Sequence, residues 1–282
     1  MREACTRAHP DGDCFLIARG GAAGSAHQVA QWAGDSVASE GSPGLGAAVH
    51  AQLAQALSGQ PIFGSDIAGY SGRQDGSIPT AGTFVRWAQF GALSPIFETP
   101  NHPYDYDAQT EAAIRSAAVL HDRLAPYSHA YAQQAAATGV PIVRPLVLAY
   151  PGDAVATTVD DEYLYGPDLL VAPFTTGVSA ETAAARSVYF PAGGWTNVFT
   201  GAHVIGPTTQ SVTSPYDEFP LFARDGGAIP MSTFANLDAT ATPALPEAPL
   251  PVLLPLAAAG LLLTAVSLRL RARLTPRSAP GR

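Results

Sequence analysis

Four segments decide the fold of this chain: CFLIARGG (14–21), VAQWAGD (29–35), PIFGSD (61–66) and LSPIFE (93–98). Each starts with a short apolar run and ends in a polar residue close to glycine or proline. Apolar runs of this length, without polar alternation, are typical of strands that are buried on both faces of a parallel sheet. The sequence therefore predicts strands at 14–18, 29–32, 61–65 and 93–97.

The polar residues that follow these strands are the candidate functional residues. Arg19, Asp35 and Asp66 follow the first three strands, and Glu98 and His102 follow the fourth. In a barrel of parallel strands, the side chains at the carboxyl ends of the strands form the working face of an enzyme. We therefore expect Arg19, Asp35 and Asp66 to meet in one pocket at that rim.

Helical patterns separate the strands. Residues 45–57 repeat leucine or valine every four positions and end at Ser58-Gly59, and residues 107–138 read as one long helix that ends before Gly139. Strands and helices in alternation predict a parallel α/β sheet, and four such units amount to half of an eightfold (β/α)8 TIM barrel, the second half, over residues 1–150.

The pattern changes after Tyr163. Short strand-like runs broken by Gly, Pro and Thr continue to about residue 230 and predict a β-sandwich over residues 151–237. The fold class is thus α/β followed by all-β, with a Pro/Ala/Thr-rich linker at 238–249.

Composition excludes several classes of protein. Of 282 residues, 47% are hydrophobic and 13% charged, which indicates a packed core rather than a disordered chain. All 15 basic residues are arginine, and because none cluster before the last 14 residues, nucleic-acid binding is not expected. We predict Cys5 and Cys14 to be free thiols, with a disulfide across the intervening turn as the alternative.

The C-terminal segment is the feature that predicts location. Residues 250–268 carry no charge and are long enough, at about 1.5 Å per residue, to cross a bilayer core as a single-pass transmembrane helix. The basic tail at 269–282 follows at once, which the positive-inside rule places in the cytoplasm. The alternative is a buried apolar helix. The N-terminal residues MREACTRAHPDGD lack the apolar core of a signal peptide, so we expect the start of the parent protein to lie upstream.

Seven ordered stretches resemble glycoside hydrolase family 31, the α-glucosidases, α-xylosidases and related retaining enzymes. They are ARGGAAGS (18–25), WAGD (32–35), GSDIAGY (64–70), VRWAQFGALSP (85–95), the stretch 124–151, and the strand-rich stretches 160–174 and 188–201. The resemblance covers residues 13–230. It implies a catalytic TIM barrel, a proximal β-sandwich and hydrolysis of α-linked oligosaccharides or glycosides. The predicted membrane segment, and not the resemblance, places the full-length parent at the cell surface with its domain outside the cell.

The resemblance also implies roles for individual residues. Asp35 matches the general acid/base, a group that must be protonated to donate to the glycosidic oxygen. Arg19 and Asp66 match sugar-binding residues, and Trp32 would stack on a sugar face. For each there is a structural alternative: a turn for Asp35, an ion pair for Arg19, a cap for Asp66 and core packing for Trp32. Arg86 and Trp87 are motif residues that we expect to be part of the scaffold.

Two departures from the family pattern affect function. α-Glucosidases of the family carry an Arg and a His after the eighth strand, whereas this chain has Glu98 there and a displaced His102, which could still reach a sugar hydroxyl or be a loop residue. The nucleophile, an Asp in a WxDxxE-like motif, has no counterpart in the sequence. We therefore expect a fragment that is inactive alone. The rival is a catalytically inactive carbohydrate-binding or scaffold protein at the cell surface.

No metal or organic cofactor is expected. The resemblance implies hydrolysis by carboxyl groups and water alone, and the sequence shows no Cys/His cluster with the spacing of metal ligands.

Overall fold

The computed structural model describes residues 2–10, 14–21, 24–27, 29–70, 78–178 and 180–238. Residues up to Asp238 form one compact unit, so the predicted boundary at residue 150 stays a prediction. Apart from Asp238, the predicted linker, membrane segment and basic tail lie outside the described residues. Among the helices that are described, none is long and apolar enough to cross a membrane.

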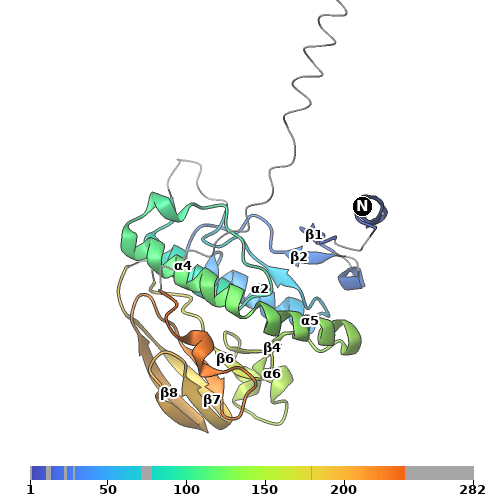
Figure 1. Ribbon diagram of the computed structural model, residues 1–282. Helices are drawn as coiled ribbons and strands as arrows, with labels where there is room; N and C mark the ends of the chain where they lie inside the picture. Colours follow the sequence, from blue (N-terminus) through green and yellow to red (C-terminus); the bar gives the residue numbers. More distant parts are fainter. Residues whose placement is uncertain are drawn as a thin grey trace, which may run out of the picture. The chain divides into compact units, whose positions relative to one another are not determined.

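The first layer is a small parallel sheet. Strands β1 (Ile17–Ala18), β2 (Ala30–Trp32) and β3 (Phe63–Gly64) pair in that order, with Ala18 opposite Gln31 and Trp32 opposite Gly64 (Figure 1). This confirms the predicted parallel α/β arrangement. The fourth predicted strand at 93–97 is wrong, because those residues form a turn and irregular chain after a helix and only one parallel bridge, Asp66 to Glu98, continues the sheet. Pro95, which has no N–H to donate to a ladder, lies in this stretch.

One helix connects β2 to β3, and a second follows β3. Helix α2 (Leu45–Leu57) has the predicted bounds and buries Leu45, Val49 and Leu53 on one face. Helix α3 (Ala81–Ala92) begins at Thr80, whose side chain accepts a hydrogen bond from the Thr83 N–H, and is buried along nearly its whole length.

The long predicted helix is two helices. Helix α4 (Ala108–Arg123) begins at Asp107, which caps the Thr110 N–H, and helix α5 (Ala125–Thr138) ends at Gly139 in the left-handed conformation. The start of α4 and the end of α5 agree with the prediction, but the helix is interrupted at Leu124. Pro126, in the first turn of α5, cannot donate to a preceding carbonyl, and this separates the two helices.

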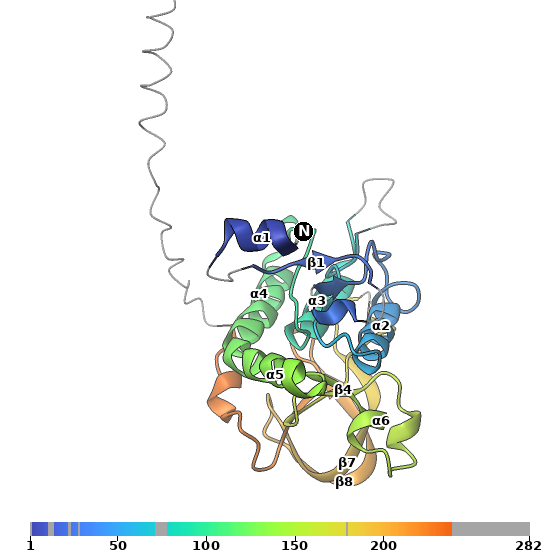
Figure 2. The same ribbon diagram turned by 90° about the vertical axis from the view of Figure 1, so that its right-hand side faces the viewer.

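The second layer is a six-stranded sheet in the order β4-β5-β6-β9-β7-β8, whose strands all pair antiparallel. In Figures 1 and 2 this sheet lies at the lower end of the molecule, away from β1 and β2. The predicted β-sandwich is therefore one continuous sheet, in which β7 shifts register between Phe190 and Gly193. Its first strand, β4, lies in the part of the chain that the sequence assigned to the barrel. The strands are β4 (Val143–Pro145), β5 (Tyr163–Tyr165), β6 (Leu169–Val171), β7 (Ala184–Asn197), β8 (His203–Ser214) and β9 (Leu221–Arg224).

The central strands of this sheet are buried on both faces. Leu169, Val171 and Leu221 belong to the core that includes the helices, whereas Leu170 and Phe222 belong to a second core with Trp195. Because side chains alternate across a strand, one short strand contributes to both cores. Full burial of such a side chain contributes about 1.5–3 kcal/mol.

Arg86 joins the two layers. Its guanidinium, on α3 and almost fully buried, donates to the carbonyl oxygens of Glu218 (2.5 Å), Thr182 (3.1 Å) and Pro215 (3.2 Å). It also lies 4.7 Å from the centre of the Phe174 ring. Burial lowers the pKa of Arg86 to about 10, so the side chain stays charged at neutral pH. These contacts agree with the scaffold role expected for this residue.

The N-terminal segment corrects the prediction of free thiols. Helix α1 (Arg2–Ala8) carries Cys5, which is joined to Cys14 by a disulfide. The Cα atoms lie 5.9 Å apart, a distance typical of disulfides that the spacing of the two cysteines in the sequence could not establish. The remaining short elements are α6 (Leu146–Ala149) and the 3-10 turns Ser25–His27, Pro103–Asp105, Ala156–Thr158 and Met231–Phe234.

Candidate active site

A pocket of about 480 Å³ opens where the parallel strands end. Asp35 lies three residues after β2, Asp66 two residues after β3, and Glu98 at the parallel bridge beyond them. Parallel strands present their carboxyl ends at one edge, so residues far apart in the sequence meet there. The described lining residues are Trp32, Asp35, Asp66, Tyr70, Glu98, Thr99 and Pro100.

Arg19 lies beside the pocket rather than in its wall. Its Nη2 is 3.7 Å from Asp35 Oδ2, and its guanidinium lies 5.7 Å from the centre of the Trp32 ring. Gly34, with φ of +79°, makes this approach possible, since a Cβ there would lie 3.0 Å from Arg19 Nε. The Arg19 side chain is 66% exposed, so the ion pair adds little stability and leaves the guanidinium accessible to a ligand.

Asp66 is the most buried carboxyl of the pocket, with 7% of its surface exposed. Burial raises its pKa, the nearby Asp35 charge adds to this, and the Trp32 indole N–H and Arg19 oppose it. The Trp32 indole lies close to the Asp66 carboxyl group but does not meet hydrogen-bond geometry. Trp32 Nε1 and Asp66 Oδ2 therefore both lack a hydrogen-bond partner among the described residues. Asp66 is thus held in a protein environment that favours its protonated form.

Glu98 is the second carboxyl with a raised pKa, which results first from burial and then from the charge of Asp66. Its Oε1 is also buried and without a hydrogen-bond partner in the described structure. The sequence places Glu98 after the fourth apolar run, but we assigned it no role in the pocket and treated it as a departure from a family pattern. Its place directly beyond an apolar run, like that of Asp66, was the signal that could have assigned it to the pocket.

The chain on both sides of Asp66 is held by groups from two neighbouring segments. Trp87 Nε1 donates to Ser65 Oγ (2.9 Å), and Asn101 Nδ2 donates to the carbonyl oxygens of Ile67 (3.0 Å) and Gly69 (3.1 Å). Ala68 and Gly69 both have positive φ, a conformation that these contacts stabilise. The sequence analysis missed Asn101, because nothing in a single sequence marks a side chain that caps carbonyls of another loop.

His102 does not line the pocket. Its ring stacks on Tyr104, with 4.9 Å between the ring centres, and its Nδ1 lies 3.7 Å from Asp105 Oδ2. The structure thus brings Arg19, Trp32, Asp35 and Asp66 together and leaves His102 at the surface nearby. A role of His102 in sugar binding stays a prediction.

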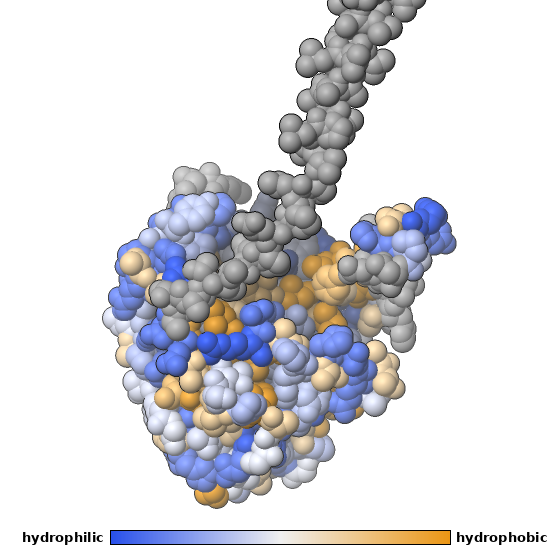
Figure 3. All heavy atoms as spheres, in the orientation of Figure 1, coloured by the Kyte–Doolittle hydropathy of each residue, from blue (hydrophilic) through white to orange (hydrophobic). Residues whose placement is uncertain are grey.

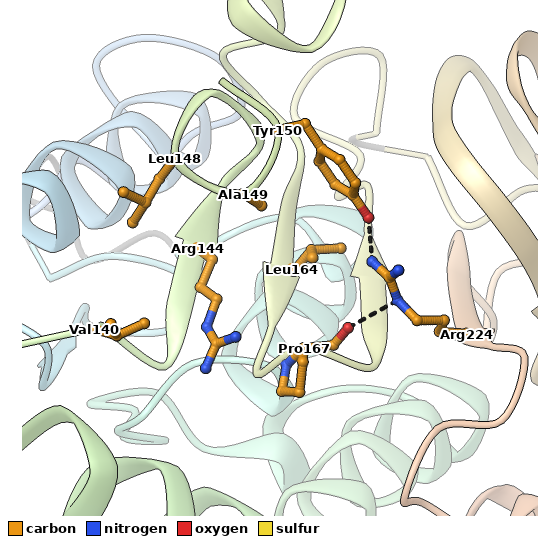
Figure 4. A pocket seen from close by; sticks show the side chains of 8 residues that line it. All are labelled: Val140, Arg144, Leu148, Ala149, Tyr150, Leu164, Pro167 and Arg224. Atoms are coloured by element: carbon orange, nitrogen blue, oxygen red, sulfur yellow. Dashed lines mark hydrogen bonds between the residues drawn. The ribbon is translucent and has the colours of Figure 1, made fainter. Parts of the chain in front are cut away.

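A second cavity, of about 450 Å³, lies between β4, α6 and the strands beside them (Figure 4). Arg224 lines this cavity and donates to Tyr150 Oη and to the Pro167 carbonyl oxygen (3.1 Å). Arg144 donates to the Pro141 carbonyl oxygen (3.1 Å). None of the described residues that line this cavity is a carboxylic acid.

What the first pocket can do follows from its groups. It offers carboxyl groups in different environments, an aromatic surface at Trp32 and Tyr70, and an accessible guanidinium at its edge. Carboxyl groups of unequal proton affinity are what general acid/base catalysis requires. The described residues contain no group of three His, Cys, Asp or Glu side chains that could hold a metal ion.

Two family models match the chain. Residues 1–131 match the glycosyl hydrolases family 31 TIM-barrel domain, and residues 139–229 match the glycosyl hydrolase family 31 C-terminal domain. Together they extend over both layers of the fold.

Curated relatives and solved structures point to the same family as the two family models. The chain is 30% identical to an isomaltosyltransferase of Sporosarcina globispora over 79% of its own length, and 33% identical to a sulfoquinovosidase of Agrobacterium fabrum over 76%. It covers 21% and 33% of those relatives. A Flavobacterium johnsoniae dextranase of the same family, solved with glucose, superposes with a TM-score of 0.70 at 29% identity, covering 80% of this chain and 29% of the dextranase. The chain therefore spans a fifth to a third of the length of these proteins.

Proposed function

Because the chain belongs to glycoside hydrolase family 31, we propose that it carries the acid/base side of a retaining α-glycoside hydrolase site. The substrates would be α-linked oligosaccharides or glycosides, cleaved at the O-glycosidic bond as by an α-glucosidase. The observation that carries this proposal is the pocket at the ends of β2 and β3, where Asp35, Asp66 and Trp32 meet beside Arg19.

In this proposal Asp35 is the general acid/base. Its side chain is 36% exposed, and it is bordered by Arg19 on one side and the buried Asp66 on the other. A substrate that fills the pocket would exclude water from Asp35. Trp32 would stack on the sugar, while Arg19 and Asp66 would bind its hydroxyls.

We further propose that this chain alone does not turn over α-glucosides. Retention of configuration needs a second carboxylate, about 5–5.5 Å from the acid/base, that forms a covalent glycosyl-enzyme. The sequence contains no WxDxxE-like segment to supply that nucleophile. Binding without turnover is therefore the expected behaviour of the 282-residue chain, in the manner of a fragment.

The test measures binding and turnover separately. The full chain is titrated with methyl α-glucoside by ligand-observed NMR and assayed with an aryl α-glucoside. We expect binding that Trp32→Ala weakens, and no turnover above that of Asp35→Asn. Robust turnover lost in Asp35→Asn would show that the chain contains its own nucleophile and would refute the proposed inactivity. No binding of any sugar would refute the site itself.

The second candidate is an inactive carbohydrate-binding or scaffold protein, favoured by the missing nucleophile motif. The two are separated by complementation. A separately expressed polypeptide with the first half of a family 31 barrel, including its nucleophile, is added to the chain. Turnover that appears on mixing and requires Asp35 supports the hydrolase, whereas sugar binding without turnover supports the scaffold.

We also propose that residues 250–268 anchor the full-length parent in a membrane, with the acidic domain outside the cell and the arginine tail in the cytoplasm. The support is the sequence alone: an uncharged segment of spanning length followed by arginines. Protease treatment of intact cells that express the parent should remove an epitope around Trp195 and spare the tail. Protection of that epitope, or recovery of the parent in the soluble fraction, would contradict this topology.

A further inference from the structure

Glu98 occupies a position where the family pattern has arginine, and the structure places it beside Asp66. The two residues form the parallel bridge that continues the sheet beyond β3, and the Ile67 N–H donates to the Glu98 carbonyl oxygen at 2.9 Å. Both side chains line the same pocket. The sign of the charge at this place is therefore the reverse of that in the family pattern.

Each of the two carboxyl groups has one buried oxygen that lacks a hydrogen-bond partner among the described residues: Asp66 Oδ2 and Glu98 Oε1. Asp66 is more than nine-tenths buried, so bulk water does not readily replace a missing partner. Ionised carboxylates only accept hydrogen bonds, and a ligand that satisfies both oxygens must therefore offer two donors. Neighbouring hydroxyl groups of a sugar do so.

The walls of the pocket favour a sugar over a bare cation. Trp32, Tyr70 and Pro100 supply apolar surface against which the C–H face of a sugar ring can pack. In the part of the chain that the structure describes, no three His, Cys, Asp or Glu side chains are grouped so that they could hold a metal ion.

The charges of the pocket disfavour an anion. Asp35, Asp66 and Glu98 line it, whereas Arg19 lies at its edge against Asp35. Even where the effective dielectric constant is raised by nearby solvent, a neighbouring like charge opposes the binding of an anion. Burial, which raises the pKa of both Asp66 and Glu98, shows that the site already holds negative charge with difficulty.

We propose that Glu98 determines the specificity of this pocket: with Asp66 it accepts hydrogen bonds from two hydroxyls of an uncharged sugar, and it repels sugars that carry a carboxylate or a sulfonate. This inference rests on the proposed sugar site and goes beyond it, since that site alone does not decide between neutral and anionic sugars. It distinguishes the chain from its sulfoquinovosidase relative.

The experiment compares two ligands of the same shape and different charge. The full chain is titrated at pH 7 with methyl α-glucoside and with methyl α-glucuronide, which carries a carboxylate at C6. The variants are Glu98→Gln, which keeps the shape and removes the charge, and Glu98→Arg, which reverses it. Glu111→Gln, on the exposed face of α4 where Glu111 pairs with Arg115, is the matched control.

The ratio of the two dissociation constants is the readout, because a loss of folded protein would change both constants and leave their ratio unchanged. We expect the wild type and Glu111→Gln to favour the neutral glycoside by about tenfold or more, a ratio that Glu98→Gln reduces severalfold and Glu98→Arg inverts. A ratio near one in the wild type, or one indifferent to both Glu98 variants, would overturn the inference and leave the sugar site intact. Absence of binding by both glycosides would overturn the sugar site, and the inference with it.

Discussion

At the scale of one residue, Asp66 is a group that the pocket uses although its burial lowers the stability of the folded protein. A carboxyl group that is 7% exposed and has an oxygen without a partner costs free energy when it is ionised. The folded state reduces this cost by holding the proton more tightly than the unfolded chain does, which is the meaning of the raised pKa of Asp66. Residues that are held at such a cost are typical of sites that bind or react.

The first prediction is the stability of Asp66→Asn. Between the unfolded pKa of 3.8 and the raised pKa of the folded state, the native protein binds more protons than the unfolded chain, so this carboxyl makes the protein less stable as pH rises through that window. The amide cannot ionise. We therefore expect the free energy of unfolding of Asp66→Asn, relative to that of the wild type, to be about 1 kcal/mol higher at pH 7 than at pH 4. Urea unfolding at both pH values measures the difference. Asp122→Asn, at an exposed position on α4, is the control. Equal pH dependence in wild type and Asp66→Asn would contradict the argument.

The second prediction concerns Gly34 in the WAGD motif. An alanine at φ of +79° costs about 1–2 kcal/mol, and its Cβ would push against the Arg19 guanidinium. We expect Gly34→Ala to lower the melting temperature and to weaken sugar binding through Arg19 and Asp35. Gly59→Ala, also at positive φ but with open space around it, should lower the melting temperature similarly and leave sugar binding unchanged. Unchanged sugar binding in Gly34→Ala would remove the reason we give for glycine in this motif.

At the scale of the elements, the site depends on contacts between loops rather than on the strands themselves. The parallel strands are two or three residues long. The turn after Asp66 owes its shape to Asn101 and Thr99, and Trp87 holds Ser65 on the other side of Asp66. A short strand places only the start of a loop. Side-chain hydrogen bonds to the loop carbonyls decide where the following carboxyl group points.

The third prediction is therefore made for Asn101→Ala. Removing the amide leaves the Ile67 and Gly69 carbonyl oxygens without these two hydrogen bonds in a buried place, and we expect a loss of about 2–3 kcal/mol in the free energy of unfolding. Chemical denaturation measures it. Gln109→Ala, which removes an amide at an exposed position on α4, should change stability much less. Similar losses in the two variants would show that the Asn101 contacts are not special.

At the scale of the whole molecule, the parallel layer is the less protected one. Strand β1 pairs only with β2 among the described strands, and Phe15 and Ile17 beside it are 67% and 40% exposed. Figure 3 shows apolar surface gathered on this side of the molecule, near β1 and β2. An unpaired strand edge with apolar neighbours is prone to association with another chain.

The fourth prediction is that the chain self-associates through this surface. The double variant Phe15→Ser and Ile17→Thr should shift the protein toward the monomer in sedimentation equilibrium at micromolar concentrations. Ile205→Thr, on β8 and 66% exposed, removes similar apolar surface elsewhere and should leave association unchanged. If Ile205→Thr has the larger effect, the interface lies at the antiparallel sheet instead.

The sequence by itself determined what depends on local pattern and on resemblance. The parallel α/β layer, the bounds of α2, the outer ends of α4 and α5, and the meeting of Asp35 and Asp66 beside Arg19 all follow from apolar runs, capping residues and ordered motifs. These signals lie within a few residues of what they predict, so a single chain reveals them.

Only the tertiary structure decided the rest. The Cys5–Cys14 disulfide, the single bridge in place of a fourth strand, the joining of β4 to the antiparallel sheet, and the place of Glu98 in the pocket with His102 outside it depend on contacts between distant segments. A strand is defined by its partner, and the proton affinity of a carboxyl by what surrounds it. Neither is a property of neighbouring residues along the chain, because the hydrogen bonds and the burial that create them form only when the chain has folded.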